Sequence, residues 1–303
     1  MGVRETHLVR LLPVRVVWLA LPLTAGTAAA DVLGDWRDAP RIVAAALLFL
    51  AWGIGLVALL APRPTGLTAV RVVAPAFAVL GVAAALAGDA STVAAVGGIL
   101  GTVAAALLVA DPAVALAAAN AIAYGEERRY PLRVPPALYL APVPLARVVV
   151  AAGVACGPLL LADGSYGAGG VALVGGLTLA WFAARSLQSL VRRWLVLVPA
   201  GIAVVDGMTL VDPVLFVRRT LRGVRARAGT AEIPDGVADL RLGATLGTVV
   251  LETDGTVDVV RASRRGRPSE TLHPDGLLLA VAGRTDLLTR LSRVGTHNDL
   301  HGR

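Results

Sequence analysis

The side chains with the clearest chemical potential in this sequence are arginines, which gather in three segments. A guanidinium group can bind a phosphate or carboxylate through two hydrogen bonds at once. A basic face held against a bilayer therefore attracts anionic headgroups, by about 1 kcal/mol per residue near the surface. The three groups are Arg128, Arg129 and Arg133; Arg218, Arg219, Arg222, Arg225 and Arg227; and Arg261, Arg264, Arg265 and Arg267.

Each arginine group also has a plainer interpretation. The chain has no lysine, so all 28 basic residues are arginine, as GC-rich bacterial codon usage would give. The groups at 218–227 and 261–267 are either a lipid-binding face or an ordinary solvated face. The group at 128–133 is either a solvated turn that fixes membrane topology, or an ordered element that docks on the C-terminal domain or on headgroups. Nucleic-acid binding is disfavoured, because Phe216 is the one aromatic residue near the two later groups that could stack on bases.

The other polar residues form no recognisable catalytic or metal-binding set. Without lysine there is no P-loop, kinase-type or Schiff-base lysine. Glu126 and Glu127 are adjacent, so they would not face each other on a helix. Cys156 lies in an apolar run, where a thiol is inert. We therefore expect a non-enzymatic protein with no cofactor and no catalytic or metal site, including in Gly164-Ser165-Tyr166-Gly167 and among the tail residues His297, Asn298, Asp299 and His301.

Composition predicts that the first part of the chain lies in a membrane. Hydrophobic residues make up 56% of the chain and charged residues 16%, whereas soluble domains contain roughly 25% charged residues. A helix needs about 20 apolar residues to cross a bilayer. Six segments approach this length without an internal Asp, Glu, Arg or His: 16–30, 42–61, 72–87, 92–110, 148–162 and 167–184.

The absence of charge inside these segments argues against a proton-coupled pump or a transporter of charged substrates. Two glycine pairs, Gly97 with Gly101 and Gly153 with Gly157, have the spacing that lets membrane helices approach closely. The apolar run 113–123 is too short to span and is expected to form an interfacial or re-entrant helix.

Arginine counts in the loops predict the orientation. The N-terminal tail, the loops at 62–71 and 111–147, and the segment after 184 are rich in arginine. The 31–41 loop balances two arginines with three aspartates, and the remaining two loops carry none. The positive-inside rule then places both termini in the cytoplasm of a multi-pass plasma-membrane protein. Cleavage of the first segment as a signal peptide, after residues 28–30, is an alternative that leaves this orientation unchanged.

From residue 191 the pattern changes to short strands, which divides the chain into domains at 1–190 and 191–303. Two Asp-Gly pairs are typical hairpin turns: Asp206-Gly207 would join strands 202–205 and 208–211, and Asp254-Gly255 would join strands 248–253 and 256–261. Further strands are expected at 214–218, 221–226, 239–243 and 277–282.

A closing amphipathic helix is predicted at the end of this domain. Thr285 can cap it, and a stripe of apolar residues recurs on one face. The stripe is expected to pack on the sheet and consists of Leu287, Leu288, Leu291 and Val294.

Short strands closed by one helix resemble the pleckstrin-homology-like (PH-like) β-barrel, and bacterial membrane proteins in which such a domain directly follows transmembrane helices. The resemblance is carried by Arg193-Trp194-Leu195-Val196-Leu197-Val198-Pro199-Ala200-Gly201-Ile202, by Pro213-Val214-Leu215-Phe216-Val217-Arg218 and by the strand–helix 276–291. The stretch 262–273 departs from it, being longer and more polar than a compact barrel needs. The six-helix part resembles uncharacterised actinobacterial multi-pass membrane proteins.

The expected fold class is thus an α-helical transmembrane bundle of about six helices with a small C-terminal β-rich, PH-like domain and a closing helix. We expect a membrane scaffold or accessory protein that presents this domain in the cytoplasm to a partner protein or to anionic lipid. The alternative is a subunit of a lipid or small-molecule transporter or flippase, with 111–147 as a gating element and a groove near Asp111 and Asn120.

Overall fold

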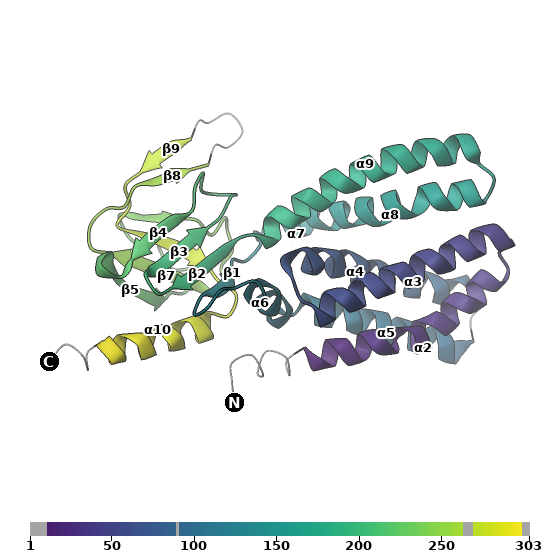
Figure 1. Ribbon diagram of the computed structural model, residues 1–303, viewed down its shortest axis with the longest axis horizontal. Coiled ribbons are helices and arrows are strands. Elements are labelled where there is room, and N and C mark those ends of the chain that lie inside the picture. The colour runs from purple at the N-terminus through teal and green to yellow at the C-terminus, as the bar shows by residue number, and fades with distance from the viewer. Residues whose placement is uncertain (1–10, 89–90, 263–268, 299–303) are drawn as a thin grey trace. The chain divides into compact units, whose positions relative to one another are not determined.

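The computed structural model describes residues 11–88, 91–262 and 269–298, with the side chains of all of these except 293–298. Six helices are long and apolar enough to cross a bilayer, and each coincides with one of the six predicted segments. The chain is therefore a multi-pass membrane protein. The six helices, labelled in Figure 1, are α2 (Leu12–Gly34), α3 (Asp38–Leu60), α4 (Pro64–Ala87), α5 (Thr92–Ala110), α8 (Pro142–Ala162) and α9 (Tyr166–Val191).

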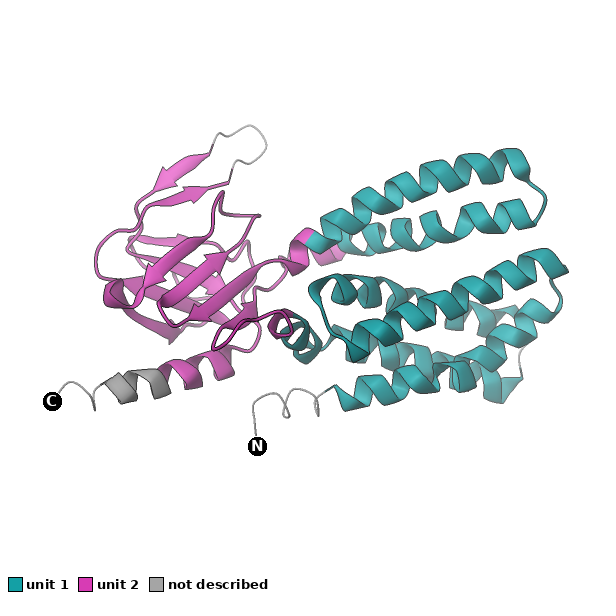
Figure 2. Ribbon diagram, viewed as in Figure 1, with its two compact units in different colours: residues 1–118, 141–188 teal, residues 119–140, 189–303 magenta. Residues whose placement is uncertain are grey.

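The chain divides into two compact units, coloured separately in Figure 2. Unit 1 comprises Met1–Ala118 and Ala141–Gln188, and unit 2 comprises Ala119–Leu140 and Ser189–Arg303. The sequence placed residues 119–140 in the helical domain, whereas they group with the β-rich part of the chain. This segment contains the end of the short helix α6 (Pro112–Asn120), the first strand, and the single-turn helix α7 (Pro136–Leu140).

Five of the six membrane helices continue through arginines that the sequence placed in loops; in α3 this is Arg41, which forms an ion pair with Asp38. Arg15, Arg71, Arg147 and Arg185 lie inside α2, α4, α8 and α9, which contain 23, 24, 21 and 26 residues. The predicted spans themselves contain no charged residue, but the helices extend beyond those spans into the flanking charged residues. Each of these arginines lies toward one end of its helix, where a long side chain can direct its charge to the bilayer surface while the backbone stays helical.

A reciprocal pair of tryptophans joins α2 to α3. The Trp18 indole N–H donates to the Trp52 carbonyl, and the Trp52 indole N–H donates to the Trp18 carbonyl, each at 2.9 Å. The buried Trp18 ring also stacks on Phe77 of α4, with 5.9 Å between the ring centroids. Gly55 makes room for it, because a Cβ there would overlap the Trp18 ring. An unpaired indole N–H is costly in hydrocarbon, so both donors are satisfied within the bundle.

Glycines on α5 and α8 bring neighbouring helices together. Gly153 and Gly157 lie against the backbone of α9, as their spacing suggested, and a Cβ on either would overlap it. On α5 the predicted pair is shifted by one residue. Gly97 has open space beside it, whereas Gly98 and Gly101 contact α2.

Two arginines tie the ends of helices in unit 1. Arg37, before α3, forms an ion pair with Asp163, after α8, and donates a further hydrogen bond to the Asp163 carbonyl at 2.8 Å. The turns before α3 and after α8 therefore meet at one end of the unit, as the predicted topology requires. Arg15 donates to the Leu59 carbonyl at 3.0 and 3.1 Å, where the C-terminal end of α3 favours a cation.

The described strands of unit 2 form two four-stranded sheets and one two-stranded ladder (Figure 1). The sheet orders are β1-β2-β3-β4 and β5-β7-β10-β6, and all neighbours are antiparallel except β10 and β6. β8 pairs with β9. The bounds are β1 (Arg128–Pro131), β2 (Trp194–Val198), β3 (Gly201–Val205), β4 (Val214–Val217), β5 (Leu221–Ala226), β6 (Val237–Asp239), β7 (Thr248–Thr253), β8 (Val259–Arg261), β9 (Glu270–Leu272) and β10 (Gly276–Ala280).

The helix α10 (Arg284–Asn298) closes unit 2 and packs on β5. It begins one residue before Thr285, which therefore lies in its first turn rather than at its cap. Leu287 is fully buried, and Leu288 and Leu291 are half-buried; the Val294 side chain lies outside the described residues. The predicted class, a transmembrane bundle followed by a β-rich region with a closing helix, is confirmed.

The hairpin turns differ from those predicted. The tight turn lies at Pro199 and Ala200, because Val198 pairs with Gly201 in the β2–β3 ladder. Asp206 instead ends β3, with its side chain buried. Asp254-Gly255 does follow β7, but β7 pairs with β5 and β10 rather than with the next strand. The chain does turn after Asp206, whose carbonyl accepts from the Thr209 and Leu210 N–H groups, but β3 then pairs with β4 and not with 208–211.

Candidate functional site

The segment 128–133 is an ordered part of unit 2. β1 pairs with β2 in the register Arg128↔Leu197 to Pro131↔Trp194. Asn120 holds the strand: its amide nitrogen donates to the Arg129 carbonyl at 2.8 Å, and its amide oxygen accepts from the Arg129 N–H at 3.0 Å. Of the two interpretations left open by the sequence, the ordered element describes this segment.

The Arg129 side chain is used within unit 2. Its Nε donates to Glu127 at 2.8 Å, and its guanidinium carbon lies 4.9 Å from the centre of the Trp194 ring. The two charged side chains are only 16% and 18% exposed. Burial alone would raise the pKa of Glu127, but hydrogen bonds from Arg129 and the Tyr124 N–H, together with the Arg129 charge, outweigh it and lower that pKa. Arg129 therefore has a structural partner on each side.

Arg193 forms the most deeply buried ion pair among the described residues. Its Nε and Nη2 donate to the two Asp206 carboxylate oxygens at 2.6 and 2.8 Å, with both side chains at most 1% exposed. Its Nη1 donates to the Arg133 carbonyl at 3.1 Å. Asp206 also accepts from the Met208 N–H at 3.0 Å and the Thr209 hydroxyl at 2.7 Å. Every buried carboxylate oxygen thus has donors, which a buried pair requires.

A second, partly buried contact joins β1 to α10. The Tyr130 hydroxyl donates to an Asp286 oxygen at 2.7 Å, and Arg290 Nε donates to the same oxygen at 2.9 Å. Burial, followed by the Asp286 carboxylate, raises the pKa of Tyr130 far above its usual range. The phenol therefore stays a neutral hydrogen-bond donor. β1 is thus held both by its pairing with β2 and by this contact with α10.

The arginines at 218–227 have mostly the opposite character. Arg218 and Arg219 lie in the single 3-10 turn between β4 and β5 and are exposed. Neither forms an ion pair with any described residue. Arg222 and Arg225 on β5 have side chains 71% exposed and meet Asp254, at 3.8 Å, and Glu252. Exposed pairs of this kind are weak, so the face keeps a positive character.

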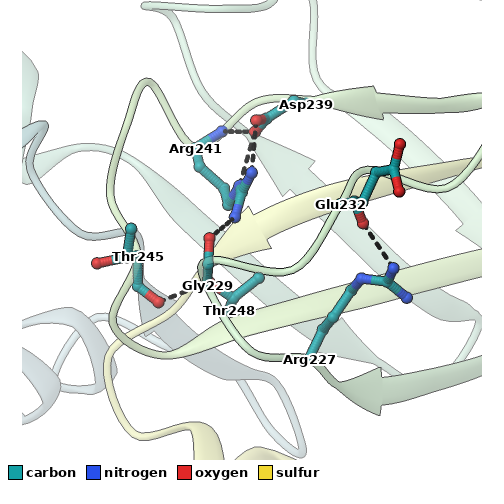
Figure 3. A network of polar contacts seen from close by, with 7 residues as sticks. All are labelled: Arg227, Gly229, Glu232, Asp239, Arg241, Thr245 and Thr248. Atoms are coloured by element: carbon teal, nitrogen blue, oxygen red, sulfur yellow. Dashed lines mark hydrogen bonds and ion pairs between the residues drawn. The ribbon is translucent and has the colours of Figure 1, made fainter.

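Arg227 is the exception in this group, as Figure 3 shows. It is half-buried, and its Nη2 donates to the Glu232 carbonyl at 2.5 Å. In the same network Arg241 donates to both Asp239 oxygens, at 3.0 and 2.8 Å, and to the Gly229 carbonyl at 2.7 Å. These arginines organise the loops between β5 and β7.

A hollow of about 550 Å³ opens on another part of unit 2, beside the edge strand β4. Its lining includes apolar side chains, of which Phe216 is buried and the others are exposed or half-buried, and two carboxylates. The residues concerned are Leu215, Phe216, Val257, Val260, Asp212 and Asp258. No sequence pattern pointed to this hollow, because its two sides are about forty residues apart and meet only through the strand order.

Other predicted groups fall partly outside the described residues. In the third arginine group only Arg261 is described, at the end of β8; Arg264, Arg265 and Arg267 are not. Of the histidine-containing tail, 299–303 are not described. Among the residues that are described, no cluster of three His, Cys, Asp or Glu side chains could hold a metal ion.

The sequence missed the two polar side chains that do most to order β1 and β2. Asn120 was treated as an interruption of an apolar run, and Arg193 as one of several topology-setting arginines. A signal for Arg193 was present: in the observed β2–β3 register, Arg193 and Asp206 come next after Trp194↔Val205. A hairpin centred on Pro199-Ala200 places these opposite charges across from each other.

Comparisons with known proteins add no relative. No family model, curated protein or solved structure matches this chain. The resemblance to PH-like domains and to actinobacterial membrane proteins therefore remains a prediction.

Proposed function

We propose that this chain is a non-enzymatic accessory protein of the bacterial plasma membrane, whose helices hold unit 2 at the cytoplasmic surface. There its exposed arginines bind anionic lipid headgroups. The observation that carries the proposal is the group Arg218, Arg219, Arg222 and Arg225, which is exposed and keeps an excess of positive charge. Each such residue near an anionic surface contributes about 1 kcal/mol.

The distribution of arginine along the helices supports the cytoplasmic placement. Arg15, Arg71 and Arg147 lie in the N-terminal halves of α2, α4 and α8, and Arg185 lies near the C-terminal end of α9. If successive helices alternate in direction, these four positions share one side of the bilayer, whereas Arg41 at the start of α3 lies on the other side, where Asp38 pairs with it. The positive-inside rule makes the side with the four arginines the cytoplasm.

Chain connections keep unit 2 close to that surface. The backbone passes between the units three times, after residues 118, 140 and 188. Only Arg192 and Arg193 separate α9 from β2. Because the domain cannot diffuse away, weak contacts with headgroups act at a high effective concentration.

We assign lipid binding to the arginines whose guanidinium groups are not buried inside unit 2. Arg129 and Arg227 donate hydrogen bonds inside unit 2, and the Nε atoms of Arg133 and Arg227 are buried without a hydrogen-bond partner among the described residues. They are therefore assigned structural roles, while Arg128, which makes no ion pair with a described residue, stays a secondary lipid candidate.

The transporter alternative gains no specific support. That alternative predicts a groove between helices near Asp111 and Asn120, with 111–147 as the gating element. The Asp111 carboxylate instead accepts from the Ala113 N–H at 2.6 Å at the start of α6, and Asn120 binds the Arg129 backbone.

Lipid contact can be measured in the full chain. Ala226, an exposed residue at the end of β5, is changed to cysteine in a Cys156→Ser background and labelled with a fluorophore. The labelled chain is placed in nanodiscs of phosphatidylcholine alone or with phosphatidylglycerol, each containing a headgroup-attached quencher. We expect quenching to be stronger with phosphatidylglycerol and to fall as salt is raised.

The double variant Arg218→Gln, Arg219→Gln should remove most of that difference, because it deletes the two charges without an acidic partner. Arg227→Gln is the matched control from the same segment and should leave the difference in place. Equal quenching in both lipid mixtures, or a loss caused equally by the control, would refute lipid binding through this face.

A further inference from the structure

The edge strand β4 lies beside the hollow described above. Its sheet ends there, since β4 pairs with β3 and with no other described strand. In an antiparallel strand, alternate residues direct their N–H and C=O groups away from the paired neighbour. β4 therefore offers backbone donors and acceptors to an added strand, and an uncovered edge is a template for such pairing.

The hollow also exposes apolar surface. Leu215 on β4 is 50% exposed and Val260 on β8 is 36% exposed, and both line it. Val211, which is 52% exposed, lies next to Val260, because its N–H donates to the Val260 carbonyl at 3.0 Å. Exposed apolar surface beside an open strand edge can receive the side chains of an added extended segment.

The charge of the residues that line the hollow indicates which kind of extended segment could bind there. Asp212 and Asp258 line the hollow and are exposed, and none of the described arginines lines it. Asp258 is bonded to His273 at 2.7 Å, and Asp212 forms no ion pair with a described residue. Like charges are excluded from such a site and opposite charges are attracted, so a segment with arginine or lysine is complementary.

We propose that this hollow binds an extended basic segment of a partner membrane protein, which adds to β4 as a further strand. Its backbone would pair with β4, its apolar side chains would cover Leu215 and Val260, and its basic side chains would meet Asp212 and Asp258. Cytoplasmic segments next to membrane helices combine apolar and basic residues, as the positive-inside rule demands. The partner's identity rests on the cytoplasmic placement proposed above; the binding chemistry does not.

The test uses the full chain in detergent micelles and a fluorescent peptide of alternating valine and arginine. Fluorescence anisotropy should show saturable binding that weakens as salt is raised. A peptide of alternating valine and glutamate should not bind. Leu215→Arg places a positive charge in the hollow, where it would repel the basic peptide. We expect it to weaken binding about tenfold or more, as substitutions in the centre of other interfaces do.

Two further variants make the outcome decisive. Asp212→Asn with Asp258→Asn preserves size and should weaken binding several-fold. Arg218→Gln with Arg219→Gln should leave peptide binding intact while reducing the lipid-dependent quenching, so the two proposals fail separately. The inference is overturned if the arginine peptide does not bind, or if peptide binding is unchanged by both Leu215→Arg and the double variant Asp212→Asn, Asp258→Asn. It is also overturned if that double variant changes only the lipid-dependent quenching.

Discussion

The arginines around β1 and those around β5 carry the same charge in different surroundings. Arg129, together with Arg193 beside it, is buried against carboxylates and an aromatic ring. Arg218, Arg219, Arg222 and Arg225 are exposed to solvent. The comparison teaches that an arginine-rich segment is a binding surface only where the fold leaves its guanidinium groups without buried partners.

The largest expected effect comes from breaking the buried pair. Arg193→Ala leaves the Asp206 carboxylate buried without its partner, which should destabilise unit 2 by about 3–5 kcal/mol. Hydrogen exchange of the β7 and β10 amides in the full chain measures this, because those strands are the most buried. Arg222→Ala is the exposed control and should stay within about 0.5 kcal/mol of the parent. If both variants lowered the stability of unit 2 by similar amounts, the distinction between buried and exposed arginines would be wrong.

A smaller effect is expected for Arg129→Gln. It removes the contact with Glu127 and the stacking on Trp194, together worth about 1 kcal/mol in a partly buried setting. Arg128→Gln on the same strand is the matched control, since Arg128 forms no ion pair with a described residue. The same hydrogen-exchange measurement on β1 and β2 should separate the two variants. If Arg128→Gln proved the more damaging, the assignment of Arg129 to structure would be wrong.

The smallest effect concerns acid pH. Burial raises the pKa of Asp239, but the hydrogen bonds and charge of Arg241 outweigh this and lower it. The unfolded chain then binds more protons, so the pair stabilises unit 2 above the ordinary aspartate pKa of about 3.9 and loses that contribution as pH falls through the lowered value. Asp239→Asn and Arg241→Gln should both flatten the acid side of the stability profile. If the dependence of stability on pH were unchanged in both variants, the Asp239–Arg241 pair would not contribute to stability as described.

The helical part of the fold was largely predictable, because the cost of placing charge in hydrocarbon marks spans directly in the sequence. Apolar length alone missed the arginine-containing ends of α2, α3, α4, α8 and α9, since a helix can continue where hydrocarbon ends. Strand positions such as 221–226 and 248–253 were predictable from local pattern, and both match β5 and β7.

Strand pairing and the sites were harder to predict. β1 lies more than sixty residues before its partner β2, and no local pattern links them. The Asp-Gly signal at 206–207 favoured a hairpin between 202–205 and 208–211, whereas β3 pairs with β2 and β4 and the chain only turns there. Composition likewise cannot distinguish the arginine groups, because only the tertiary structure shows which guanidinium groups have buried partners and which are exposed.

The most direct test of the central claim is the sidedness of the two units' exposed residues. Single cysteines at Tyr124, Arg222 and Tyr166, which are well exposed, are placed in a Cys156→Ser background and treated with a membrane-impermeant thiol reagent in intact cells. The account predicts labelling of Tyr166→Cys in intact cells, and of Tyr124→Cys and Arg222→Cys only after permeabilisation. Labelling of Arg222→Cys in intact cells would place the arginine face outside and contradict the account.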